Sequence, residues 1–595
     1  MYDPQAEPDL IEFENVDLCD EKYVEGPKFR NRRTSIFVTF ADPSIALVDV
    51  QKMMETGMNI ARFKTSHSTT GDKVRLLKKF DKAANILAAK YGLLYWPCAT
   101  CIELKTCVAN TGILEEDAFE IHIREGTDII MTSDVQMYNK CNAENIFVDN
   151  PYLTSDVKVG MLINIAADEI ITKCTAILNN KNIKCHVVKG GQLQNMAHVC
   201  MRGAKRTRPY LTKADLHIIK FAVEYQVDMI IINYARHVDT VKKIKRYLGS
   251  KVKRPIIVAG LCSEQGIDNV DSIIREADAI LLSREFASYE VPMHLYHKMS
   301  LVQSYIAAKC RQVGKPFYLS GEIFKNALNT GVFHAREFSD VTNAILQGTS
   351  ALVLGPSANV DYLMAVMRTI NDLCASVEPL TNDRGEFFRN VSQLKMPLNA
   401  AEACAVSCTF IANQTKSRII VCPTVNGRTT YLLNWLRPPH VIIAVTTKIR
   451  TVRILCTQRS VIALLYKGAP RRNWFRSVQA RIDYAIQYAV ENHWIQYGDH
   501  YVTLEKGTEA SPFCDCVRVW TVTTVKKNTI ECPESYHDFA LNDYLEIPPI
   551  QKRSPAVKKR SISDAFKDQD LDTILAEVLQ RTAEDEKHKT YIESF

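Results

Sequence analysis

Strands and helices alternate along the chain from about residue 210 to residue 356, and this alternation constrains the fold more than any other feature. The predicted strands of this pattern are the apolar runs VDMIIINYA (227–235), RPIIVAGL (254–261), AILLSRE (279–285), KPFYLSGEI (315–323) and ALVLGP (351–356). These runs are apolar throughout rather than alternating, which is typical of parallel strands buried on both faces. Because the repeat extends over about 250 residues in all, it favours a TIM (β/α)8 barrel over an open doubly wound sheet, which periodicity alone does not exclude.

The barrel pattern begins near the start of the chain and is then interrupted. The run SIFVTF (35–40) and the helical stretch 45–57, which ends at Gly57, make a first βα unit. Between residues 97 and 202 short strands occur without long helices, which indicates an inserted β-domain. We therefore assign residues 28–97 and 203–378 to the barrel and residues 98–202 to an inserted, β-barrel-like lid domain.

A different region begins after residue 378. One long helix (399–415), the strands RIIVCP (418–423) and HVIIAVT (440–446), and a hairpin-like end predict a C-terminal α/β domain over residues 379–525. Residues 526–595 are polar and rich in charge, so we expect a disordered tail with one terminal amphipathic helix. Residues 1–27 form a separate N-terminal segment.

The composition argues against several classes of protein. The formal net charge of +7 is small for 595 residues and the basic residues are scattered, so nucleic-acid binding is not expected. The 18 cysteines stand mostly apart without paired zinc knuckles, which favours reduced thiols and a cytoplasmic location. An acidic N-terminus and the lack of an apolar run of eighteen residues predict no secretion and no membrane contact.

Several motifs in unbroken order resemble those of the pyruvate kinase family. METGMNIARFKTSH (54–67) is similar to the family's Gly-Met-Asn-Val-Ala-Arg-Leu-Asn-Phe-Ser-His motif, and IELKT (102–106) is similar to the segment that leads into the inserted domain. The resemblance continues through RRTSIFVTFADPS (32–44), GKPFYLSGEI (314–323), SDVTNAILQGTSALVLG (339–355) and LRPPHVIIAVT (436–446). It covers roughly residues 28–525 and implies the same three-domain fold.

The resemblance also implies a reaction, the last step of glycolysis, in which a phosphoryl group passes from phosphoenolpyruvate to ADP to give pyruvate and ATP. Magnesium and potassium are the cofactors it implies. By resemblance Arg62 and Arg284 hold the substrate phosphate, because a planar guanidinium binds phosphate in a bidentate manner. His67 and Lys105 lie on the nucleotide side. The alternative for Arg62 is an ion pair with a structural carboxylate.

Four positions of the phosphoryl-transfer and divalent-metal sites depart from the family pattern. The family lysine over the phosphoryl group aligns with Gly260, and the threonine beside the substrate aligns with Gly321. The two carboxylates that hold the divalent metal align with Cys262 and Phe286, which offer no oxygen ligand to a hard cation. Because the loss of one preorganised charged group costs about 10² to 10³ in rate, we expect weak or absent kinase activity.

Two acidic residues support the opposite expectation. Glu264 lies two positions beyond Cys262, and Glu285 is adjacent to Phe286. A modest backbone shift would bring both carboxylates to a metal as surrogate ligands. Neither would replace the family lysine, so they do not by themselves restore the chemistry.

The monovalent cation site implied by the resemblance is also changed. We assign it to Lys64, Ser66, Cys98 and Ala99, where Lys64 replaces a family Asn and Cys98 with Ala99 replaces an Asp-Thr pair. The Lys64 ammonium would then occupy the space of the potassium ion and make the site metal-free. A Lys64 that extends to solvent from a drifted loop is an equal alternative.

The loop that binds fructose bisphosphate in the family corresponds to CPTVNGRTTY (422–431). Thr424, Gly427, Arg428 and Thr429 are kept, whereas Asn426 stands in the segment that replaces Lys-Ser. A glycine-bearing loop with hydroxyl groups and one arginine can cradle an anion. A simple strand-to-helix turn accounts for the same residues.

Three functions are compatible with this pattern. The first is a non-catalytic member of the family that acts as a regulatory or structural partner. The second is a working, divergent pyruvate kinase, and the third is a phosphometabolite sensor that binds through Arg62 without turnover. By resemblance we also expect a homotetramer, or a mixed oligomer with an active paralogue.

Overall fold

The structure is a computed structural model that describes residues 32–523, apart from 41–42, 65–69, 105–108, 116–117, 167–168, 202–203, 205–210, 250–253, 358, 395 and 469–472. The predicted N-terminal segment, the tail and its terminal helix therefore lie outside the described residues. The chain divides into two compact units, and the second contributes only residues 243–249 to the described part. The four sheets of the described residues belong to the first unit.

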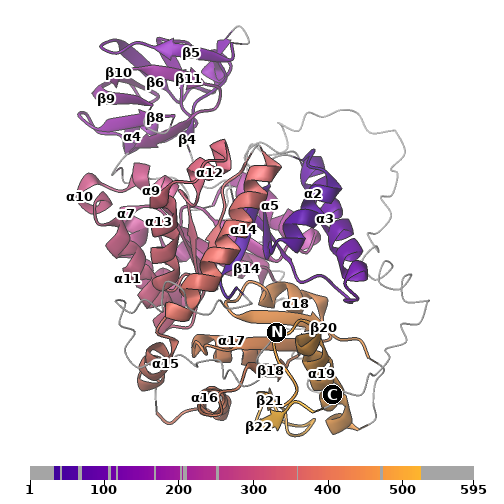
Figure 1. Cartoon of the computed structure of the whole chain (residues 1–595). Helices are drawn as coiled ribbons and strands as arrows, with labels where there is room; N and C mark the ends of the chain where they lie inside the picture. The colour runs from indigo at the N-terminus through magenta and orange to yellow at the C-terminus, as the bar shows by residue number, and fades with distance from the viewer. Residues whose placement is uncertain are drawn as a thin grey trace, which may run out of the picture. The chain divides into compact units, whose positions relative to one another are not determined.

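Eight of the described strands close into a parallel barrel in the order β1-β17-β16-β15-β14-β13-β3-β2, which confirms the predicted TIM barrel (Figure 1). Their bounds are β1 (Ser35–Phe40), β2 (Ile60–Phe63), β3 (Ala99–Glu103), β13 (Met229–Ile232), β14 (Ile256–Leu261), β15 (Ala279–Ser283), β16 (Phe317–Ser320) and β17 (Ala351–Val353). The sequence analysis placed β3 in the lid domain from residue 98, and this boundary is wrong, because β3 pairs in parallel with both β2 and β13.

Helices follow the barrel strands along the chain. Their bounds are α2 (Leu47–Glu55), α3 (Thr70–Lys90), α5 (Lys213–Glu224), α6 (Val238–Leu248), α7 (Glu264–Asp268), α8 (Val270–Glu276), α9 (Arg284–Glu290), α10 (Met293–Tyr296), α11 (Met299–Gln312), α12 (Lys325–Thr330), α13 (Ala335–Leu346) and α14 (Val360–Val377). Local sequence fixes several of their starts. Thr212 and Asp215 form a capping box at α5, and the Asn359 side chain accepts hydrogen bonds from two backbone N–H groups of α14.

The interior of the barrel is a packed apolar core rather than a channel. Side chains at alternate strand positions fill it, and they include Phe37, Ile60, Ala99, Cys101, Met229, Ile231, Val258, Ala279, Leu281, Tyr318, Ala351 and Val353. The rings of Phe37 and Tyr318 lie 5.1 Å apart within this cluster. Because strand side chains alternate with period two, the next inward positions along each strand must lie at its carboxyl end.

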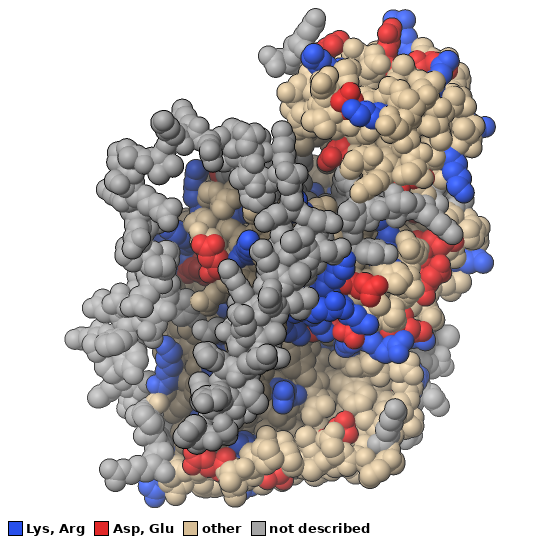
Figure 2. All heavy atoms as spheres, turned by 180° about the vertical axis from the view of Figure 1, so that it is seen from behind, with Lys and Arg blue, Asp and Glu red and all other residues tan. Residues whose placement is uncertain are grey.

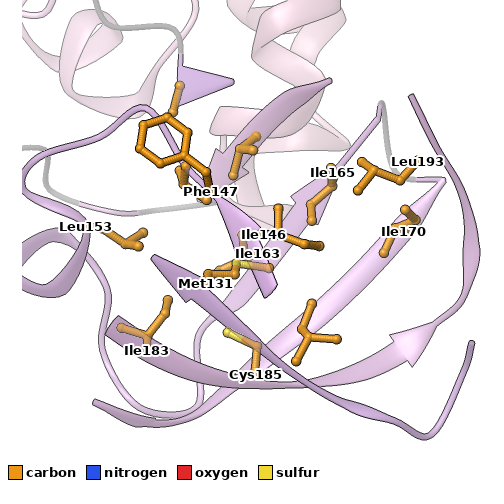
Figure 3. Close-up of a cluster of buried hydrophobic side chains, with 14 of the residues drawn as sticks. Met131, Ile146, Phe147, Leu153, Ile163, Ile165, Ile170, Ile183, Cys185 and Leu193 are labelled. Atoms are coloured by element: carbon orange, nitrogen blue, oxygen red, sulfur yellow. The ribbon is translucent and has the colours of Figure 1, made fainter. Parts of the chain in front are cut away.

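The interrupting segment builds a sheet of its own. Seven described strands pair in the order β4-β12-β8-β9-β10-β6-β7, with β5 and β11 as a separate pair. The bounds of these elements are β4 (Ala109–Asn110), β5 (Glu120–Ile123), β6 (Asp128–Thr132), η2 (Val135–Met137), β7 (Asn145–Phe147), α4 (Leu153–Asp156), β8 (Leu162–Ile165), β9 (Ile170–Ile177), β10 (Asn182–Lys189), β11 (Gly191–Gln194) and β12 (His198–Met201). Figure 3 shows its core, in which Met131, Ile163, Ile183 and Cys185 converge.

The C-terminal region is an α/β domain whose strands order as β20-β19-β18-β21-β22 among the described residues. Their bounds are β18 (Ile419–Pro423), β19 (Val441–Thr446), β20 (Val461–Leu465), β21 (His500–Glu505) and β22 (Cys516–Thr521). The helical elements here are η3 (Glu378–Leu380), α15 (Asp383–Ser392), α16 (Ala400–Gln414), α17 (Arg428–Trp435), α18 (Ile449–Leu455) and α19 (Trp474–Glu491). The predicted helix, both predicted strands and the terminal hairpin are confirmed, the hairpin as the antiparallel pair β21 and β22.

A buried ion pair joins the barrel to the C-terminal domain. Arg453 on α18 donates to the Asp228 carboxylate at 2.7 Å and to the Thr100 hydroxyl at 2.7 Å. Asp228 also accepts from the Thr100 backbone N–H at 2.8 Å. Burial alone would lower the pKa of Arg453, but the neighbouring Asp228 carboxylate holds that pKa well above its ordinary value. The charged arginine is therefore satisfied in a dry interface.

Charged side chains of opposite sign are mixed on the surface. On the face seen in Figure 2, blue basic groups lie beside red acidic ones rather than in one broad area of either colour. Pairs such as Lys309 with Asp271 and Arg254 with Asp278 contribute to this mixing. Among the described helices, none combines the length and the apolar character that crossing a bilayer requires.

Candidate functional site

The polar side chains of the barrel interior gather at the carboxyl ends of its strands. The alternation that buries Phe37, Ile60 and Met229 directs Thr39, Arg62, Glu103 and Asn233 inward one or two steps later. Hydrogen bonds connect them, since Arg62 donates to Thr39 at 3.4 Å and Asn233 donates to Glu103 at 3.4 Å. This layer is the mouth of the barrel, where TIM barrels carry their chemistry.

Arg62, the predicted phosphate ligand, forms an ion pair in the structure. Its Nη2 lies 2.5 Å from Oε2 of Glu103, and the two residues are 8% and 5% exposed. Burial alone would lower the pKa of Arg62, but the Glu103 carboxylate raises it overall. The Nε of Arg62 is buried and has no hydrogen-bond partner among the described residues. The pairing matches the alternative stated for this residue, and it leaves one charged donor unused.

Arg284, the second predicted phosphate ligand, is also engaged with protein groups. Its Nη1 and Nη2 bind the two carboxylate oxygens of Asp340 at 2.6 and 2.7 Å. Its Nε and Nη2 donate to the carbonyl of Gly321 at 3.1 and 2.9 Å. This bidentate geometry fixes the guanidinium at the start of α9 and fastens β16 to α13.

The backbone is packed against Gly260 and Gly321, the two positions where the sequence analysis places the family's lysine and threonine. A Cβ added to Gly260 would lie 2.7 Å from the carbonyl oxygen of Ile232, and one added to Gly321 would lie 2.4 Å from the amide nitrogen of Glu285. Gly321 also has a φ of +83°, in the left-handed region that side chains disfavour. A larger residue at either position would require the neighbouring backbone to move.

The two positions predicted to correspond to the family's metal carboxylates lie in an apolar cluster. Cys262 is 2% exposed and is buried with Tyr234, Ala287 and Val291, while Phe286 packs against the same group. The Phe286 ring lies 5.6 Å from the Tyr234 ring. A thiol and two aromatic rings do not fit a hard divalent cation, which prefers oxygen ligands.

Glu264 and Glu285, the two candidate surrogate ligands, do not form a metal site with this cluster. Glu264 begins α7 and faces His294, with 3.5 Å between its Oε1 and the histidine Nε2. Glu285 is exposed in the first turn of α9 and acts on Arg62 through its charge. In the part of the chain that the structure describes, no group of three or more His, Cys, Asp or Glu residues is arranged to hold a metal ion.

Comparison with known proteins assigns the family. Residues 31–366 match the family described as pyruvate kinase, barrel domain, and residues 402–520 match the one described as pyruvate kinase, alpha/beta domain. The chain belongs to the pyruvate kinase family. The resemblance stated from the sequence is thereby confirmed, together with its barrel and its C-terminal α/β domain.

Curated pyruvate kinases match most of the chain at low identity. Pyruvate kinase 1 of Trypanosoma brucei brucei is 24% identical over 479 residues, which is 80% of this chain and 93% of that protein. Pyruvate kinase PKLR of Homo sapiens is 25% identical over 494 residues, or 83% and 85% of the two chains. Pyruvate kinase of Dictyostelium discoideum is 27% identical over 497 residues, or 82% and 94%.

The structure separates two residues of the monovalent cation site predicted for this pyruvate kinase family member from Lys64, which was assigned to the same site. Ala99 begins β3 opposite Ile60, and the Cys98 thiol donates to the carbonyl of Met58 at 3.4 Å, so both lie at the amino end of the strand. Glu103 lies four residues on, about 13 Å along the strand, beside Arg62. Cys98 and Ala99 are therefore not brought to Lys64.

Other predicted positions of the pyruvate kinase site are only partly covered. Lys64 follows β2, where its backbone N–H donates to the carbonyl of Phe40 at 3.2 Å and its side chain is half-buried. Ser66, His67 and Lys105 lie outside the described residues. The roles given to these four residues stay predictions.

The predicted effector loop is an ordered turn between β18 and α17. Gly427 has a φ of +81°, and its N–H donates to the Thr424 hydroxyl at 3.0 Å. The N–H of Arg428 donates to Asn426 at 3.3 Å, and the Thr429 hydroxyl donates to the Cys514 sulfur at 3.2 Å. These contacts account for a strand-to-helix turn, and anion binding there stays a prediction.

Three further side chains near the mouth were given no role in the sequence analysis. Tyr234 places its hydroxyl 3.5 Å from Nε2 of His198, a residue of β12 in the lid sheet. The guanidinium of Arg236 lies 5.4 Å from the centre of the Tyr234 ring. Tyr234 and Arg236 directly follow the strand VDMIIIN, and position after a barrel strand was the signal that could have found them.

Proposed function

We propose that this protein is a member of the pyruvate kinase family with little or no kinase activity, which acts as a regulatory or structural partner. The observation that carries the proposal is the apolar cluster of Cys262, Phe286 and Tyr234 at the positions of the family's metal carboxylates. Phosphoryl transfer depends on positive charge around the moving group, and this cluster supplies none. Magnesium and potassium binding are accordingly proposed to be weak or absent.

Two further observations support the proposal. Gly260 carries no ammonium group, and Ile232 lies so close that its carbonyl would contact any added side chain. Arg284 already binds Asp340 and Gly321 through its Nε, Nη1 and Nη2 atoms. The charges that would neutralise a phosphoryl group are thus either replaced or engaged by protein groups.

Pyruvate formation by the purified full-length protein tests this proposal. Phosphoenolpyruvate and ADP would be supplied with potassium and either magnesium or manganese, beside an active pyruvate kinase as the positive control. We expect a turnover at least about 10³-fold below the kinase range of roughly 1 to 100 per second. A turnover within that range would overturn the proposal and favour a working, divergent kinase.

A second candidate function is a sensor that binds a phosphorylated metabolite through Arg62. The observation that favours it is the buried Nε of Arg62 at the barrel mouth, a charged donor for which the described part of the chain offers no partner. Calorimetry with phosphoenolpyruvate, with and without magnesium, separates the possibilities. Binding without metal supports the sensor, binding that needs metal supports the enzyme, and no binding leaves the structural role.

Variants make this measurement specific. Arg62→Gln removes the guanidinium at the mouth and should abolish any metal-independent binding. Arg254→Gln is the matched control, because Arg254 precedes β14 at the opposite end of the strand and pairs with Asp278 at 2.8 Å. Equal loss of binding in both variants would show that binding does not depend on Arg62.

The proposed partner role includes assembly in the cytoplasm, as a homotetramer or as a mixed oligomer with an active paralogue. Light scattering on the purified chain measures its mass, and co-expression with an active pyruvate kinase tests for mixed assemblies. A monomer in both experiments would contradict the assembly part of the proposal.

A further inference from the structure

Two cysteines in the C-terminal domain lie side by side beneath the turn that leads into α17. Cys422 is on β18, and Cys514 lies in the segment between β21 and β22. Both belong to the buried cluster of this domain, with exposed fractions of 0% and 6%. Both are free thiols.

The surroundings of the two sulfurs are unequal. The Cys422 thiol donates a hydrogen bond to the Cys514 sulfur, and this contact lowers the pKa of Cys514 and raises that of Cys422. The Thr429 hydroxyl donates to the Cys514 sulfur at 3.2 Å, and the Lys506 ammonium adds positive charge. These donors outweigh burial, so the pKa of Cys514 lies below its ordinary value. Thiolate is the nucleophilic form of cysteine.

The position of Cys514 is fixed by its own loop. The Asp515 carboxylate accepts from the Gly507 N–H at 2.7 Å and from the Ser511 hydroxyl at 2.6 Å, and its backbone N–H donates to the Glu505 carbonyl at 3.0 Å. This turn presents the sulfur of Cys514 to Thr429, in the first turn of α17. The pair therefore contacts the loop predicted to bind an effector.

We propose that Cys514 and Cys422 form a peroxide-sensitive dithiol, in which Cys514 is oxidised first and Cys422 resolves it to a disulfide. The Cys514 thiolate attacks one oxygen of hydrogen peroxide, the O–O bond breaks, and hydroxide leaves as Cys514 becomes a sulfenic acid. The Cys422 thiol then attacks that sulfur, the S–O bond breaks, and water leaves with the thiol proton. Two thiols lose two electrons and one peroxide gains them.

Oxidation changes what α17 contacts. In the reduced protein the Cys514 sulfur accepts the hydrogen bond from Thr429. A neutral disulfide sulfur is a poorer acceptor than a thiolate, so the first turn of α17 loses a partner when the bond forms. The redox state of the pair is thereby coupled to the turn of residues 424–429, independently of any kinase activity.

The chain contains a second adjacent pair that serves as a comparison. Cys174 and Cys185 lie directly opposite each other on β9 and β10, and their thiols are hydrogen-bonded. Burial raises the pKa of Cys174, and it raises that of Cys185 to about 12. Figure 3 shows Cys185 within the lid core. Proximity is thus shared by the two pairs, but a lowered thiol pKa belongs to Cys514.

Peptide mapping of the full-length protein tests the proposal. The reduced protein would be treated with hydrogen peroxide, unfolded in urea so that buried thiols become accessible, alkylated with N-ethylmaleimide, digested and analysed by mass spectrometry. We expect a peptide linked through Cys422 and Cys514, with labelling of both residues reduced by about tenfold and restored by dithiothreitol. No link between Cys174 and Cys185 is expected under the same treatment.

Variants separate the roles of the two thiols. In Cys422→Ser, Cys514 should stop at the sulfenic acid and react with dimedone, whereas in Cys514→Ser, Cys422 should stay fully alkylated after peroxide. Cys408→Ser, in the same buried cluster, should leave the linked peptide unchanged. Full labelling of Cys514 after peroxide, or a disulfide from Cys514 to another cysteine in the wild-type protein, would overturn the proposal.

Discussion

The ring of Phe286 lies 5.6 Å from the ring of Tyr234, with 41° between their planes. Phe286 is predicted from the motifs to stand where the family has a metal-binding aspartate, and Tyr234 follows barrel strand β13. Phe286 also packs 5.7 Å from the ring of His198 on β12. The Phe286 side chain therefore connects a lid strand to the barrel mouth, which gives it a packing role.

Restoring the carboxylate should cost stability rather than return activity. Phe286→Asp removes the ring from Tyr234 and His198 and places a charge beside the buried Cys262. We expect the free energy of unfolding to fall by about 2 to 4 kcal/mol, because an aromatic contact is lost and a carboxylate is desolvated. Urea unfolding followed by circular dichroism measures the change.

A surface phenylalanine provides the control for this variant. Phe119 is 77% exposed, so Phe119→Asp should change the unfolding free energy by no more than about 0.5 kcal/mol. If Phe286→Asp is as stable as the wild type and forms pyruvate, the packing role assigned to Phe286 is wrong.

A side chain at position 260 should strain the barrel. In Gly260→Ala the new Cβ would lie 2.7 Å from the Ile232 carbonyl oxygen. We therefore expect the free energy of unfolding to fall by about 1 to 3 kcal/mol. Gly355→Ala is the matched control, because no heavy atom lies within 4 Å of its added Cβ and its φ lies outside the left-handed region. That substitution should be neutral or stabilising by up to about 1 kcal/mol. Equal effects in thermal unfolding would contradict the close packing at Gly260.

Much of the fold was predictable because its signal is local. The runs that became β13, β14, β15, β16 and β17 are apolar throughout, and such runs in repeated alternation with helices are typical of a parallel sheet covered on both faces. The boundary at residue 97 failed for a different reason. The strand β3 is short and is followed at once by the lid segment, so periodicity does not show which sheet its hydrogen bonds join.

The site was less predictable because it depends on contacts between distant residues. The substitutions at positions 260, 262, 286 and 321 are predictions that rest on the motifs alone. The pairing of Arg62 with Glu103 and that of Arg284 with Asp340 could not be read from the sequence, since they join residues 41 and 56 positions apart. The error at Cys98 and Ala99 arose from assigning the end of β3 four residues too early, which moves a residue about 13 Å along a strand.

The ion pair between the barrel and the C-terminal domain should be a large term in stability. The Asp228 side chain is only 1% exposed, and Arg453→Met leaves its carboxylate without a charged partner. We expect the free energy of unfolding, measured with denaturant, to fall by about 3 to 5 kcal/mol. Arg254→Met breaks the half-exposed pair with Asp278 and should cost no more than about 1 kcal/mol. Similar losses in the two variants would show that burial of the Asp228 pair does not matter.

Acid stability should depend on His440, a residue of the C-terminal domain that is 9% exposed. Burial, and then the nearby Arg33 guanidinium, lower the pKa of His440 from 6.5 to about 4, while Asp383 and a hydrogen bond with the Ala412 backbone act in the opposite direction. The unfolded chain therefore binds the proton at higher pH than the folded one. Stability is fully present above pH 6.5 and falls as the pH drops from about 6.5 to about 4.

The size of this effect follows from the pKa difference. A shift from 6.5 to about 4 corresponds to roughly 3 kcal/mol of unfolding free energy between neutral pH and pH 4. His440→Gln lacks this titrating group. The free energy of unfolding of the wild type minus that of the variant should therefore fall by the same amount between neutral pH and pH 4. His500→Gln, at an exposed position, should follow the wild-type profile. Urea unfolding at a series of pH values measures all three proteins, and parallel profiles for the wild type and His440→Gln would contradict a buried, neutral His440.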